Sequence, residues 1–146
     1  MLLRIGLIAG TLDIADALIF SHFRGVSPSQ VFHYIASGLL GVRAFEMGTS
    51  AYALGVLIHY TIALSWTVVY YALWRRFEVI RRTPVLSGLL YGSAVYVIMN
   101  FVVLPVSGVP KIGHVTLAAR INGVLALMLC IGLTVSVLLH RNLQRS

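Results

Sequence analysis

Asp13 and Asp16 lie three positions apart in an otherwise apolar stretch, GLIAGTLDIADALIF, residues 6–20. A carboxylate at the centre of a membrane-spanning helix costs about 2.5–3.5 kcal/mol on insertion scales, so each aspartate needs a compensating neighbour. Intramembrane acids of this kind bind small ligands, exchange protons, or fix helix register through hydrogen bonds. The pair therefore marks the first place in this chain where chemistry or binding is expected.

The helical repeat predicts where the two aspartates point. At about 100° per residue, they share one stripe of the first helix with small residues, Gly6, Ala9, Gly10 and Ala17. Small residues are where another helix packs closely in a membrane. We therefore expect both carboxylates to point into a helix bundle and away from lipid.

The other apolar runs also carry polar residues, and these lie at a similar depth if the helices are straight. Because groups at one level in a low-dielectric setting can satisfy each other, we predict a polar cluster that binds a ligand, exchanges protons or holds the helices together. Its members are Asp13, Asp16, His59, Asn100, Arg120 and Asn122. Within it, Asp16 and His59 are the expected proton-exchanging pair.

Four long apolar runs must position these residues. The chain has 146 residues, of which 59% are hydrophobic and 10% charged, with a mean hydropathy of +0.92; soluble domains have roughly a quarter charged residues. About 20 residues cross the hydrocarbon core, and the qualifying runs are about 2–21, 50–74, 84–105 and 115–139. The composition and the runs predict an all-α fold, a four-helix transmembrane bundle that forms a single integral membrane domain over residues 1–146.

A shorter helix is predicted over about 28–40. Ser27 and Gln30 form a capping box, Pro28 occupies the first turn, and Gly41 is a plausible stop. About 13 residues reach only about 20 Å at 1.5 Å per residue, too little to span. We expect this helix to be interfacial or re-entrant on the outer face.

Basic residues set the expected orientation. The net charge of +7 would suggest nucleic acid in a soluble chain, but here the arginines flank apolar runs, so the expected partner is the lipid bilayer. With both termini cytoplasmic, seven arginines lie inside: Arg4, Arg75, Arg76, Arg81, Arg82, Arg141 and Arg145. Four cations lie outside: Arg24, Arg43, Lys111 and Arg120. We therefore expect a multi-pass membrane protein with both termini on the cytoplasmic side.

No catalytic motif is present in the sequence. It contains no GxSxG and no Walker loop, and the lone Cys130 excludes an internal disulfide or a CxxC pair. We therefore expect no enzyme activity and no cofactor. A metal or haem site is the remaining alternative, since four histidines lie outward in this topology, although no HxxxH or HxxE pair places two ligands on one helical turn. They are His22, His33, His59 and His114.

Several segments carry a family resemblance when taken together. They are AGTLDI (9–14), IASGLLGVRAF (35–45), LIHYTIA (57–63), YGSAVYVIMNFVVLPVS (91–107) and CIGLTVS (130–136). They resemble a group of small, uncharacterised four-span integral membrane proteins of bacteria, and the first span is similar to that of YagU-type inner-membrane proteins linked with acid tolerance. The resemblance implies a multi-pass protein of the bacterial inner (cytoplasmic) membrane, and it implies no reaction and no catalytic residue.

Three functions remain open at this stage. The preferred one is a non-enzymatic accessory subunit or self-associating bundle. The sequence has no recognisable catalytic motif, little of the expected bundle lies outside the membrane, and two GxxxG-type faces, Gly6/Gly10 and Gly88/Gly92, are available for helix packing. Its partners would be other membrane subunits or a second copy of the chain. The alternatives are a proton-coupled small-solute transporter that uses an intramembrane aspartate, and a metal- or haem-binding membrane protein.

Overall fold

The computed structural model describes residues 1–111 and 115–144, and within these ranges the chain is all-helical with no β-strand. The expected all-α class is therefore confirmed. His114 and Arg145, which entered the predictions above, lie outside the described residues. The first half of the chain forms five helical segments: α1 (Leu2–Phe23), α2 (Pro28–Leu40), the 3₁₀ turn η1 (Gly41–Phe45), α3 (Thr49–Arg76) and α4 (Glu78–Arg82).

Two long helices make up the second half, and each is interrupted by a π-helical stretch. The first consists of α5 (Pro84–Ile98), the π stretch η2 (Met99–Val103) and α6 (Leu104–Val106). The second consists of α7 (Leu117–Ala126), the π stretch η3 (Leu127–Leu133) and α8 (Thr134–Gln144). A π stretch widens the helical turn and is often found at functional sites.

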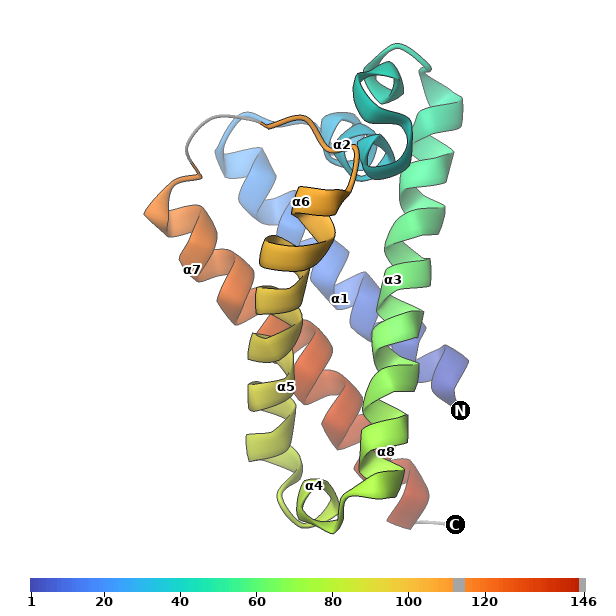
Figure 1. Ribbon diagram of the computed structural model, residues 1–146, viewed down its shortest axis with the longest axis vertical. Helices are drawn as coiled ribbons and strands as arrows, with labels where there is room; N and C mark the ends of the chain where they lie inside the picture. Colours follow the sequence, from blue (N-terminus) through green and yellow to red (C-terminus); the bar gives the residue numbers. More distant parts are fainter. Residues whose placement is uncertain (112–114, 145–146) are drawn as a thin grey trace.

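The long helices run beside one another along the length of the molecule (Figure 1). Both termini and α4 lie towards one end, and α2, α6 and the start of α7 lie at the other. Three of the helices are long and apolar enough to cross a membrane within the described residues: Thr49–Arg76, Pro84–Val106 and Leu117–Gln144. The fold is thus consistent with a multi-pass membrane protein. The fourth long helix, α1, has 22 residues and carries the two aspartates.

Local sequence signals set the bounds of α2. Ser27 Oγ accepts from the Gln30 backbone N–H at 3.3 Å, and Gln30 Oε1 accepts from the Ser27 N–H at 2.8 Å. Pro28 begins the helix, and Gly41 ends it with a φ of 60°, which favours glycine. The helix packs against α3, where a Cβ on Gly55 would collide with the backbone of Phe32. These features hold α2 firmly against the top of α3.

The glycines of the two GxxxG-type faces pack against helices of the same chain. A Cβ on Gly6 would lie 2.5 Å from Leu64 Cδ2, and one on Gly10 would lie 2.9 Å from Ala63 Cβ, so both glycines allow α1 to approach α3. A Cβ on Gly88 would lie 2.8 Å from Ser136 Cβ, and one on Gly92 would meet the backbone of η3. Close helix approach through small residues is the expected stabilising device in a membrane.

The main core lies in the half of the molecule towards α4. Its buried residues come from α1, α3, α5, η3 and α8, and they are Ile5, Ala9, Ala63, Tyr70, Tyr91, Val95, Ile131, Val135 and Leu139. Buried polar groups in this half are also paired. Tyr70 Oη donates to Ser136 Oγ at 2.7 Å, and Ser136 Oγ donates to the Pro84 carbonyl at 2.5 Å. This chain of hydrogen bonds links α3, α8 and the start of α5.

Tyr70→Phe is expected to destabilise the protein by about 1–3 kcal/mol, because it removes one partner of a buried hydroxyl network. Tyr71→Phe is the matched control, since Tyr71 lies on the same helix and its hydroxyl makes no hydrogen bond to the described residues. Thermal unfolding in a mild detergent measures the difference. Equal melting temperatures for the two variants would contradict a stabilising role for the network.

Candidate functional site

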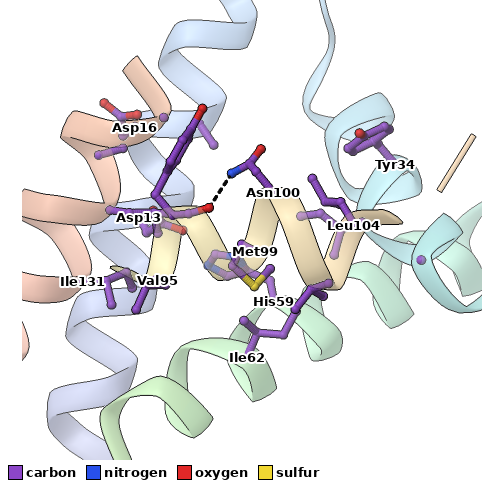
Figure 2. A pocket seen from close by; sticks show the side chains of 18 of the residues that line it. Asp13, Asp16, Tyr34, His59, Ile62, Val95, Met99, Asn100, Leu104 and Ile131 are labelled. Atoms are coloured by element: carbon purple, nitrogen blue, oxygen red, sulfur yellow. Dashed lines mark hydrogen bonds between the residues drawn. The ribbon is translucent and has the colours of Figure 1, made fainter. Parts of the chain in front are cut away.

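A cavity of about 550 Å³ opens between the helices in the half of the molecule towards α2. Residues of α1, α2, α3, α5, η2, α7 and η3 line it, and Figure 2 shows side chains from several of these helices converging on it. Its volume lies within the range of about 300–1,000 Å³ that is typical of small-molecule sites. The cavity is therefore the candidate site.

Five of the six residues predicted to cluster line this one cavity: Asp13, Asp16, His59, Asn100 and Asn122. Arg120 does not line the cavity, and its side chain is exposed. Arg120 and Asn122 lie two positions apart on α7, and two residues of an α-helix differ by about 200° in direction. Because Asn122 points into the cavity, Arg120 points away from it.

The Asp16 carboxylate is paired with an amide from the far end of the sequence. Asn122 Nδ2 donates to Asp16 Oδ2 at 2.8 Å, which joins α1 to α7. One aspartate therefore turns towards a neighbouring helix and is satisfied there. The expected pairing of Asp16 with His59 is not found, because His59 Nε2 donates instead to the Gly10 carbonyl at 2.8 Å.

The Asn100 side chain also donates a hydrogen bond to a backbone carbonyl. Its Nδ2 donates to the Tyr96 carbonyl at 2.9 Å, the hydrogen bond drawn as a dashed line in Figure 2. This bond stays within the helix that contains both residues and bridges its change from α to π geometry. The amide group of Asn100 is thus held in place by its own helix.

Asp13 differs from the other polar residues of the cavity. Within residues 1–111 and 115–144, no backbone or side-chain group donates a hydrogen bond to its carboxylate. It nevertheless lines the cavity together with Asp16 and His59. A half-buried carboxylate without a donor from the described protein is costly in an apolar setting unless a ligand, a proton or water satisfies it.

Apolar side chains form the deep end of the cavity and most of its walls. Going from α2 towards the main core, the last lining residues are Ala63, Trp66, Val95, Leu127 and Ile131. The polar lining residues of the four long helices lie nearer to α2 than these. A ligand in this site would therefore meet an apolar floor beneath a small group of polar atoms.

Sequence reasoning missed two residues that line the end of the cavity next to α2. Arg24 follows α1 and lies over the Phe20 ring at 5.7 Å from its centroid. Tyr34 of α2 also lines the cavity, and burial raises the pKa of its hydroxyl above the usual value. The signal for Tyr34 was present, because the short helix had been placed on the same side as the polar cluster, but its rotation could not be predicted.

The histidines do not assemble a metal site in the described residues. No group of three or more His, Cys, Asp and Glu side chains comes together there. His33 Nε2 donates to the Gly48 carbonyl at 2.9 Å and so ties α2 to the loop before α3, while His22 is exposed. Among these described histidines, only His59 lines the cavity.

Asp16→Leu is expected to lower stability more than Ile14→Leu, because it leaves the Asn122 amide without its acceptor. Adding Asn122→Leu should recover part of the loss, with a coupling of about 0.5–2 kcal/mol between positions 16 and 122. Unfolding in mild detergent of wild type, both single variants and the double variant gives the coupling. Additive effects would mean that the hydrogen bond contributes nothing to stability.

Comparison with known proteins adds no assignment: no family model, curated protein or solved structure matches this chain. The resemblance to four-span bacterial membrane proteins stays a prediction. The class that fold and site define is therefore an all-helical protein with three helices long and apolar enough to cross a membrane, and with a cavity lined by a carboxylate that has no donor among the described residues.

Proposed function

We propose that α1 crosses the membrane together with the three longer apolar helices, which makes the chain a four-helix transmembrane bundle in the bacterial inner membrane. The two termini lie towards the same end as α4 (Figure 1), as an even number of crossings requires. That end also carries Arg75, Arg76, Arg81 and Arg82, so it is the cytoplasmic end by the positive-inside rule. The short helix α2 then lies at the outer interface, beside the mouth of the cavity.

The proposed function is non-enzymatic binding of a small molecule in the cavity, with Asp13 as the residue that contacts the ligand. One observation carries this proposal: Asp13 lines a cavity of about 550 Å³, and its carboxylate has no donor in the described protein. A mostly apolar cavity with a few converging polar groups is the usual form of a ligand site. Ionisable groups inside a membrane mark such sites by default.

The accessory-subunit hypothesis loses one of its supports in this fold. Beside the lack of a catalytic motif and the small extramembrane mass, it rested on the faces at Gly6/Gly10 and Gly88/Gly92. Both faces are instead covered by α3 and by η3 with α8 of the same chain. A partner would therefore have to bind on other surfaces, for which the helix contacts give no specific evidence.

Transport is a second candidate, and the π-helical stretches favour it. Both η2 and η3 contribute lining residues, among them Asn100 and Ile131. Such stretches are local irregularities at which a helix can bend. Transport also requires an opening towards α4, where the main core is now tightly packed.

Thiol labelling from either side of the membrane tests the proposed function. In a Cys130→Ala background, Ala17→Cys places a thiol on the cavity wall, and Ile19→Cys places one on an exposed apolar position of the same helix. A charged methanethiosulfonate that cannot cross the membrane should label only Ala17→Cys, and only from the outer side, in spheroplasts. Failure to label Ala17→Cys, or equal labelling of Ile19→Cys, would contradict an aqueous binding cavity. Labelling of Ala17→Cys in inverted vesicles as well would favour transport.

A further inference from the structure

We propose that the ligand of this cavity is a protonated amine on a compact apolar body, with its N–H groups directed at Asp13. This inference rests on the proposed function, because it names the class of molecule that the same cavity takes. It follows from which hydrogen-bonding groups of the site are already used within the protein and which are left for a ligand.

The side-chain N–H groups near Asp13 already donate hydrogen bonds to acceptors within the protein. His59 donates through Nε2 to the Gly10 carbonyl, so this nitrogen is not available to a ligand. Asn100 donates through Nδ2 to the Tyr96 carbonyl and keeps its amide oxygen. Asn122 donates to Asp16. The Asp13 carboxylate and the amide oxygen of Asn100 are thus left as acceptors, and a ligand that supplies donors complements them.

Charge points to the same class of ligand. The lining carries the two carboxylates of Asp13 and Asp16, whereas its one guanidinium, that of Arg24, follows the end of α1 and lies over the Phe20 ring. An anion would meet two carboxylates in a low-dielectric setting, which is strongly unfavourable. A metal ion would need a cluster of ligating side chains, and none of three or more exists in the described residues. An organic cation fits both conditions.

The floor of the cavity defines the rest of the ligand. Below the polar groups lie Trp66, Val95 and Ile131, with Ala63 beside them. Burying apolar ligand surface against such side chains is favourable by about 25 cal/mol per Å². An amine with a cyclic or branched apolar body therefore satisfies both ends of the site, with its ammonium at Asp13 and its body on the floor.

Trp66 supplies a direct readout of binding. The chain has two tryptophans, and the second, Trp74, does not line this cavity. Its indole nitrogen is buried without a hydrogen-bond partner in the described residues, so Trp74→Phe removes an unsatisfied group and leaves Trp66 as the sole reporter. Trp66→Phe is the matched control, because it should lose the binding signal.

The test compares four ligands that share one apolar body. Cyclohexylmethylamine, cyclohexylmethanol, cyclohexylacetate and the trimethylammonium analogue of the amine are titrated into the purified Trp74→Phe variant in mild detergent, and Trp66 fluorescence is followed. The amine is expected to bind at least about tenfold more tightly than each of the others. Only the amine combines N–H donors with a positive charge, because the trimethylammonium analogue has the charge without the donors.

Each alternative result is decisive. Equal or tighter binding of the alcohol or the acid would overturn the amine inference while the proposed binding function stands. Equal binding of the trimethylammonium analogue would overturn the role of N–H donors. If none of the four ligands changes the fluorescence, the amine inference is overturned, and the labelling of Ala17→Cys then decides the proposed function separately.

Discussion

Replacing Asp13 with asparagine is expected to lower the affinity for cyclohexylmethylamine about a hundredfold. The substitution keeps the size of the side chain and removes the negative charge that faces the cavity. Truncating one partner of a buried, hydrogen-bonded charge pair costs about 2–5 kcal/mol, and a factor of a hundred corresponds to about 2.8 kcal/mol. Titration followed by Trp66 fluorescence measures the change.

Asp16→Asn is the control for this experiment. Asp16 lines the same cavity, but its carboxylate is already occupied by the Asn122 amide, so we expect its replacement to weaken amine binding only a few fold. If both variants lose a comparable amount of affinity for the amine, binding depends on the net charge of the cavity and not on Asp13 in particular. Unchanged affinity in Asp13→Asn would remove Asp13 from the site.

Gly132→Ala is expected to have the largest effect on folding. Gly132 lies where η3 crosses α5, and an added Cβ would collide with the Gly88 carbonyl and lie 2.7 Å from the Gly92 nitrogen. These are backbone atoms within a helix, so they cannot move aside as a side chain can. Overpacking typically costs about 1–3 kcal/mol, and we expect the upper end of that range together with a sharply lower folded yield.

Gly38→Ala is the matched control for this prediction. It introduces the same methyl group into α2, where the nearest atom, Val109 Cγ2, would lie 3.8 Å away, an ordinary contact distance. Size-exclusion chromatography of detergent-extracted protein compares the yields. If Gly132→Ala gives as much monodisperse protein as Gly38→Ala, the helices do not approach as closely as the structure shows.

The helical repeat was sufficient to orient α1 from sequence. This helix is regular over its whole length, so a fixed rotation per residue placed Gly6, Gly10, Asp13 and Asp16 on one side, and the structure turns that side towards α3 and the cavity. The same repeat places Arg120 and Asn122 on opposite sides of α7. Arg120 was assigned to the cluster by its depth alone, although it lies on the opposite side of α7 from Asn122.

The partners of individual side chains could not be predicted from sequence. The depths of Asp16, His59 and Asn122 in their helices predict that the three residues lie at one level. The packing of α1 between α3 and α7 then decides that Asp16 accepts from Asn122, while His59 donates to a backbone carbonyl. The π stretches were missed as well, because hydrophobic composition does not distinguish π from α turns. They shift the direction of every residue that follows them.

The length of the last helix is less tightly constrained than its composition at one point. The widened turns of Leu127–Leu133 accommodate a surplus residue relative to a regular α-helix. Deleting one residue there would return the stretch to regular α-helical turns and leave Ser136 beside Tyr70, with Val135 and Leu139 still in the core. A single-codon deletion at this point would therefore be less damaging than one in the regular turns of α1, where every residue that follows would rotate by about 100°.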